Sequence, residues 1–137
     1  MRDFAKAMQK KLNMPLVIIN KNLKDMLYKN KKFYGAGPQE FVSLIKNAEY
    51  VCTNSFHAVA FSSILHTKFW VFSSKDGVST SSRIHSITEQ LGLSSRVLNR
   101  SNSAQVNLTE DIDFAEVDKK LQIMVQDSKE FLLNSLN

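Results

Sequence analysis

The segment from Thr53 to His57 contains the residue types best suited to acid–base chemistry and to anion binding. It follows a short apolar run and precedes a stretch with helical character, which places it between a predicted strand and a predicted helix. Ser55 can cap that helix, whose first backbone N–H groups favour an anion. His57 is then expected in the first turn of that helix, on the side where the anion would bind. The alternative is that Ser55 only caps the helix and that His57 only packs.

A second polar segment, Ser81 to His85, also leads into a predicted helix. Arg83 can hold a phosphate or a carboxylate with two parallel hydrogen bonds. An arginine near a helix N-terminus opposes the macrodipole, and a bound anion between them would relieve that conflict. The alternative is an exposed surface arginine. We expect His85 to face a neighbouring helix.

Other candidate motifs are weaker. The glycines in the segment from Gly35 to Glu40 allow close backbone approach, but the run matches no nucleotide-binding fingerprint and predicts a turn and a helix start. Three scattered histidines and the single cysteine, Cys52, have no metal-ligand spacing, so we expect no metal site. Cys52 lies within a predicted strand, where a thiol is normally inert.

Strands and helices are predicted to alternate along the chain. Short, continuous apolar runs predict buried parallel strands. Pro38 suits a first helical position, Gly92 a helix stop, and Asp113 with Glu116 a capping box. The predicted strands are residues 15–19, 50–53, 69–72 and 96–98, and the predicted helices are 2–12, 38–48, 56–65, 82–91 and a long one from 114. The apolar stripe of the last helix is predicted to be Phe114, Val117, Leu121, Met124, Phe131 and Leu132.

This alternation predicts one α/β domain over residues 1–137, with a Rossmann-like parallel sheet and helices on both faces. Ligands in such folds bind beyond the carboxyl ends of the strands, where the segments around His57 and Arg83 are expected. Hydrophobic residues make up 43% of the chain and charged residues 23%, which excludes a disordered chain. No apolar run reaches the length of a membrane span, and no export signal is evident, so a cytoplasmic location is expected.

Positive charge is concentrated in the first part of the chain. Residues 1–50 carry ten Lys/Arg and four Asp/Glu, whereas residues 51–137 carry eight and nine. The lysines between Lys21 and Lys32 could face an anionic ligand or form a solvated surface. No nucleic-acid module accompanies them, and we expect no nucleic-acid partner.

Taken in order, these pieces resemble the polysaccharide pyruvyl transferase family. The similarity spans roughly residues 14–100 and rests on the run from Glu40 to His57, on the strand at 69–72 and on the pieces Phe61-Ser62, Ser82-Arg83-Ile84, Leu91-Gly92-Leu93 and Arg96. Asn54 and Ala58 stand where the family usually has Asp and Gly.

The resemblance implies transfer of a pyruvyl group from phosphoenolpyruvate to a sugar of a cell-surface polysaccharide or its precursor. It implies that His57 donates a proton or binds the donor, phosphoenolpyruvate, and that Arg83 binds one of the anionic groups of this donor. The other donor contacts that it implies are Ser55, Phe56, Ser82 and Asn54. Phosphoenolpyruvate is the donor substrate, and no further cofactor is expected.

The family resembles two-domain GT-B-like transferases, and this chain corresponds to their C-terminal, donor-binding half. We therefore expect the N-terminal half to be missing from this chain and to be a possible partner, alongside a homo-oligomer. Two alternatives remain. The domain could be the nucleotide-sugar half of a GT-B glycosyltransferase, or a non-catalytic domain that binds another protein.

Overall fold

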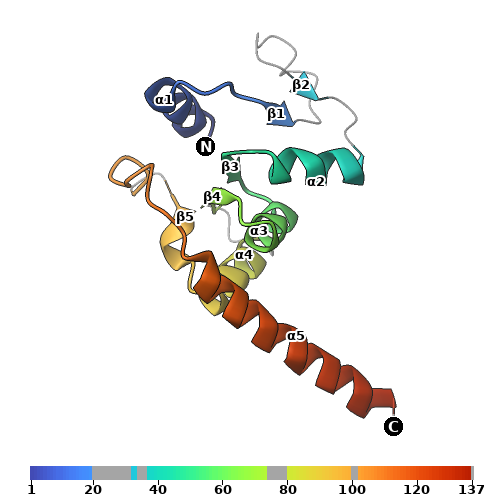
Figure 1. Ribbon diagram of the computed structural model, residues 1–137. Coiled ribbons are helices and arrows are strands. Elements are labelled where there is room, and N and C mark those ends of the chain that lie inside the picture. Colours follow the sequence, from blue (N-terminus) through green and yellow to red (C-terminus); the bar gives the residue numbers. More distant parts are fainter. Residues whose placement is uncertain (20–31, 34–36, 74–79, 100–101, 137) are drawn as a thin grey trace.

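A computed structural model describes residues 1–19, 32–33, 37–73, 80–99 and 102–136 (Figure 1). Within these ranges the chain alternates helices and strands, as the sequence predicts. The predictions for residues 21–31 and for Gly35 lie outside the described residues. No helix in the described ranges combines the length and the apolarity needed to cross a membrane.

The central sheet consists of β3 (Tyr50–Thr53), β4 (Lys68–Phe72) and β5 (Val97–Leu98). All neighbouring strands are parallel and follow the order β3-β4-β5. Thr53 pairs with Val71, so β3 and β4 end at the same edge of the sheet. The parallel sheet that the sequence predicts is confirmed, except that Arg96 belongs to the preceding 3-10 turn, Ser94–Arg96.

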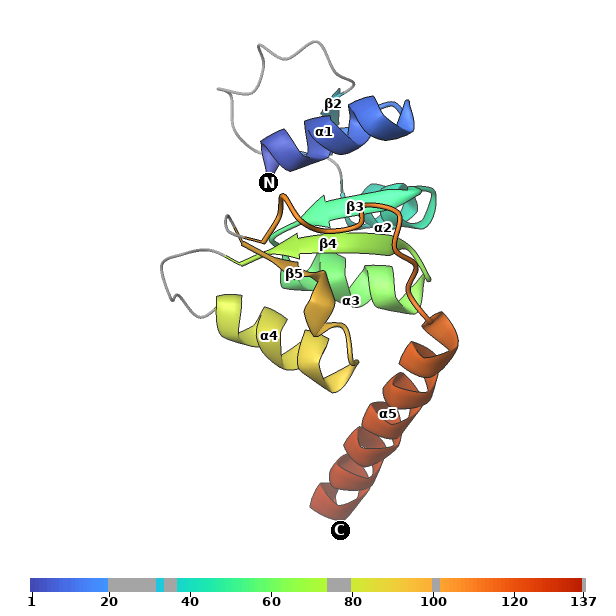
Figure 2. The ribbon, with the colours of Figure 1, turned by 90° about the vertical axis from the view of Figure 1, so that its left-hand side faces the viewer.

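Helices cover both faces of this sheet, and the middle strand β4 is therefore buried on both sides. Phe69 and Val71 point into one apolar cluster and Trp70 into another, as the two-residue period of a strand requires. α1 (Arg2–Leu12) covers the Trp70 face, while α3 (Phe56–Ile64) and α4 (Thr80–Gln90) cover the other (Figure 2). α2 (Pro38–Lys46) begins with Pro38 at its first turn, as predicted, and packs on α3.

The apolar run at residues 15–19 does not join the central sheet, so this prediction was wrong. Its strand β1 (Ile18–Ile19) is two residues long and pairs in parallel with β2 (Lys32–Phe33) in a separate sheet. Val17 is 39% exposed and Ile19 is 43% exposed, so the run is not a buried strand. An apolar run indicates a strand but carries no information about its pairing partner.

The C-terminal helix α5 (Phe114–Leu136) begins as predicted but is not buried along its length. The Oδ1 atom of Asp113 accepts the N–H groups of Ala115 at 3.1 Å and of Glu116 at 3.2 Å. Val117 is buried in the core, whereas Phe131 is 71% exposed. A helix of 23 residues is about 35 Å long. Its second half therefore extends past the sheet, as Figures 1 and 2 show, and has no core to pack against.

Candidate anion-binding site

The turn between β3 and α3 is held by a threonine hydroxyl. The backbone N–H of Ser55 donates to Oγ1 of Thr53 at 3.0 Å, and Thr53 is buried. Ser55 occupies the N-cap position of α3, as predicted, but its side chain makes no capping hydrogen bond. The predicted hydroxyl cap is therefore wrong, because the turn closes through Thr53 instead.

The first turn of α3 contains backbone donors that have no partner within the helix. The first hydrogen bond within the helix runs from the N–H of Val59 to the carbonyl of Ser55 at 3.1 Å. The N–H groups of Phe56, His57 and Ala58 precede it, so they have no carbonyl partner within the helix. Together with the macrodipole they create positive potential at the carboxyl edge of the sheet.

The beginning of α4 lies beside the beginning of α3 and carries Arg83. Ile84 is 1% exposed and packs in the same core cluster as Val59 of α3, which fixes the two helices against each other. The guanidinium carbon of Arg83 lies over the ring of Phe56, 5.7 Å from the ring centroid. The structure thus brings together two residues from predicted segments that are distant in sequence.

His57 completes this cluster. Its ring lies 5.7 Å from the Phe56 ring, centroid to centroid, with an interplanar angle of 80°. The side chains of His57 and Arg83 are both exposed, as are those of Asn54 and Ser82 beside them. The cluster of Phe56, His57 and Arg83 therefore forms an accessible surface with a fixed aromatic centre.

The other two histidines do not contribute to this cluster. His66 follows α3, adopts a φ of 55°, hydrogen-bonds Asp118 of α5 at 2.9 Å and stacks on Phe114. His85 is exposed, and its orientation toward a neighbouring helix stays a prediction. Residues two apart on a helix are separated by roughly 200°, so His85 lies opposite Arg83.

Arg96, one of the residues on which the family resemblance rests, is buried in the core. It is 2% exposed, and its guanidinium carbon lies 4.6 Å from the centroid of the Trp70 ring. It donates to the carbonyl of Glu110 at 2.9 Å and to that of Asp111. Burial lowers the pKa of Arg96 below its ordinary value. Burial likewise raises the pKa of Cys52 to about 11, which agrees with the prediction of an inert thiol.

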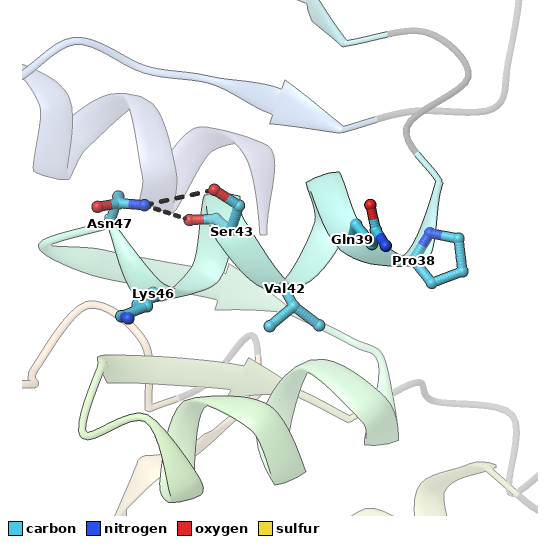
Figure 3. A pocket seen from close by; sticks show the side chains of 6 residues that line it. All are labelled: Pro38, Gln39, Val42, Ser43, Lys46 and Asn47. Atoms are coloured by element: carbon cyan, nitrogen blue, oxygen red, sulfur yellow. Dashed lines mark hydrogen bonds between the residues drawn. The ribbon is translucent and has the colours of Figure 1, made fainter.

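A shallow hollow lies along one side of α2 (Figure 3). The amide of Asn47 beside it donates to the carbonyl of Ser43 at 2.8 Å. The residues that line the hollow all come from α2 and its C-cap: Pro38, Gln39, Val42, Ser43, Lys46 and Asn47. None belongs to α3 or α4, so the hollow is separate from the cluster at Phe56.

Two features of the site were missed in the sequence. Thr53 had a signal, because a threonine two residues before a helix N-cap commonly closes a turn through its hydroxyl. The contact between Phe56 and Arg83 had none, because it depends on how α3 and α4 pack. Among the described residues, no group of three or more His, Cys, Asp and Glu side chains is arranged to hold a metal ion.

Comparison with known proteins identifies one family. The sequence model of the family described as polysaccharide pyruvyl transferase matches residues 1–76. The matched range includes β3, the turn at Thr53 and all of α3. No curated protein and no solved structure matches the chain.

Proposed function

Because the chain belongs to the polysaccharide pyruvyl transferase family, we propose that it binds phosphoenolpyruvate and takes part in pyruvyl transfer to a sugar. The observation that carries this proposal is the contact between Arg83 and Phe56. It places a guanidinium over the side chain of the first residue of α3, the helix whose first N–H groups have no carbonyl partner within the helix. Phosphoenolpyruvate carries a phosphate and a carboxylate, and these two donor sets suit its two anionic groups.

In the proposed reaction, a proton adds to the methylene carbon of phosphoenolpyruvate and makes C2 electrophilic. Two sugar hydroxyls then form bonds to C2, and the bond from C2 to the phosphate oxygen breaks. One hydroxyl proton accounts for the new methyl group, and the other leaves with the phosphate. Arg83 and the N–H groups of α3 stabilise the anionic donor and the departing phosphate.

We assign one of two roles to His57: it donates the proton, or it contacts an anionic group of phosphoenolpyruvate. It is exposed and lies in the first turn of α3, beside the proposed phosphate position. Ser55, Asn54 and Ser82 border the same surface and are proposed to contact the donor. The sugar is proposed to belong to a cell-surface polysaccharide or its precursor, in keeping with the family's description.

Calorimetric titration with phosphoenolpyruvate tests donor binding. Loss of one charge-assisted contact in Arg83→Ala should weaken binding by about 1.5–3 kcal/mol, roughly 10- to 150-fold. Lys129→Ala is the matched control, because it removes one positive charge from the exposed half of α5. Equal affinity of wild type and Arg83→Ala contradicts the proposal.

Phosphate release from phosphoenolpyruvate, with sugars that carry neighbouring hydroxyls as acceptors, tests the role of His57. His57→Ala should lower turnover by roughly 10²–10⁴-fold while the melting temperature stays within a few degrees. His85→Ala is the matched control, because it removes an exposed histidine on the opposite side of α4 from Arg83. If wild type is active and His57→Ala turns over as fast as wild type and His85→Ala, His57 is excluded from the chemistry.

A further inference from the structure

We propose that Phe56 is a positioning residue, whose ring holds Arg83 and His57 in the orientation needed to bind the donor. This inference rests on the proposed function and changes the part expected for Phe56, from a substrate contact to a support for two other side chains. It comes from two contacts that share one ring.

The ring of Phe56 is itself fixed by the core. Phe56 is half-buried and packs against the cluster that contains Val59, Phe69 and Ile84. As the first residue of α3, it also has its backbone set by the turn at Thr53. A side chain anchored in this way loses little further freedom when a ligand binds.

Arg83 needs such a support. An arginine side chain has many rotamers, and binding a ligand restricts them at a cost in entropy. Among the residues that the structure describes, no carboxylate forms an ion pair with Arg83. The described contact that orients its guanidinium is the ring of Phe56, through a cation–π interaction.

His57 is held by the same ring in a different way. Its ring meets that of Phe56 nearly perpendicularly, the edge-to-face arrangement that aromatic pairs prefer. Phe56 and His57 are neighbours at the start of α3, and the ring of Phe56 provides an apolar surface against the edge of which the imidazole packs. A single anchored ring thus couples the orientation of the guanidinium to that of the imidazole.

Substitution of Phe56 separates this role from simple packing. Phe56→Leu keeps an apolar side chain in the core but removes the aromatic face, whereas Phe56→Tyr keeps the face. In calorimetric titrations with phosphoenolpyruvate, Phe56→Leu should bind about 2- to 5-fold more weakly, and Phe56→Tyr should bind like wild type. Phe61→Leu is the matched control: Phe61 is a half-buried phenylalanine of α3 that pairs with Phe41 instead.

A double-mutant cycle supplies the decisive measurement. If Phe56 acts through Arg83, Phe56→Leu should weaken binding in the wild type but have little further effect in the Arg83→Ala background. A full additional loss in that background, or wild-type affinity of Phe56→Leu, overturns the inference. Wild-type affinity of Arg83→Ala overturns the proposed function instead, so the two failures are distinguishable. If Phe56→Leu fails to melt cooperatively, Phe56→Met replaces it in the same cycle.

Discussion

Replacement of Arg96 by alanine should destabilise the fold strongly, although Arg96 carries a charge and lies in a short turn. Its guanidinium is buried between the indole of Trp70 and the backbone of residues 110–111. The change removes the stacking partner of Trp70 and leaves two carbonyls without their donors.

The expected loss follows from these contacts. A hydrogen bond from a charged donor is worth about 1.5–3 kcal/mol, and a desolvated cation–π contact about 2 kcal/mol. These contributions overlap, so we expect the free energy of unfolding to fall by about 3–5 kcal/mol. A loss of roughly 3–5 °C in melting temperature per kcal/mol, for a chain of this size, gives a fall of about 10–25 °C.

Urea unfolding followed by circular dichroism measures this loss. Arg96→Lys should fall between wild type and Arg96→Ala, because lysine keeps the charge but lacks the planar fork. Arg83→Ala is the matched control: it removes an exposed arginine and should change stability by less than about 0.5 kcal/mol. If Arg96→Ala unfolds at the same urea concentration as Arg83→Ala, the structural role of Arg96 is refuted.

Three further predictions concern other parts of the fold. Asp113→Ala removes the side-chain cap of α5 and should lower the free energy of unfolding in urea by about 0.5–2 kcal/mol. Asp113→Asn should keep most of the stabilisation that the cap provides. The pKa of Cys52 is raised from 9.0 to about 11, so at pH 8 its thiolate fraction in the folded protein is about a hundredfold smaller than in the unfolded chain. Iodoacetamide should therefore label Cys52 quickly only after unfolding. Equal labelling rates of the folded and unfolded protein would contradict this prediction. Gly92 has a φ of 71°, so Gly92→Ala should destabilise by about 1–2 kcal/mol in thermal melting, and an unchanged melting curve would count against the left-handed turn.

Local patterns predicted the elements well, because they depend on local physics. The apolar residues of β3 and β4, the proline at the start of α2 and the Asp113 cap each have a signal within a few residues. The pairing of residues 15–19 was mispredicted, because pairing is decided by distant parts of the chain. Periodicity also extended the buried stripe of α5 to Phe131, since a helical repeat does not show where the core ends.

The candidate site was predictable in its parts but not in its arrangement. The segments around His57 and Arg83 were recognisable as strand ends followed by helix starts. Their meeting at Phe56 requires α3 and α4 to pack through Val59 and Ile84, which no short-range pattern encodes. Arg96 and Arg83 illustrate the same limit: both belong to the resemblance, yet one is buried in the structural core and the other is exposed.

The central claim is that phosphoenolpyruvate binds where α3 and α4 begin. The most direct measurement is a titration of the ¹⁵N-labelled protein with phosphoenolpyruvate, followed by amide and arginine side-chain resonances. The account predicts the largest shifts at the amides of Phe56, His57 and Ala58 and at Nε of Arg83, with loss of these shifts in Arg83→Ala. Shifts confined to the lysines of α1, to the hollow beside α2 or to α5 would contradict it, as would no saturable shift at all.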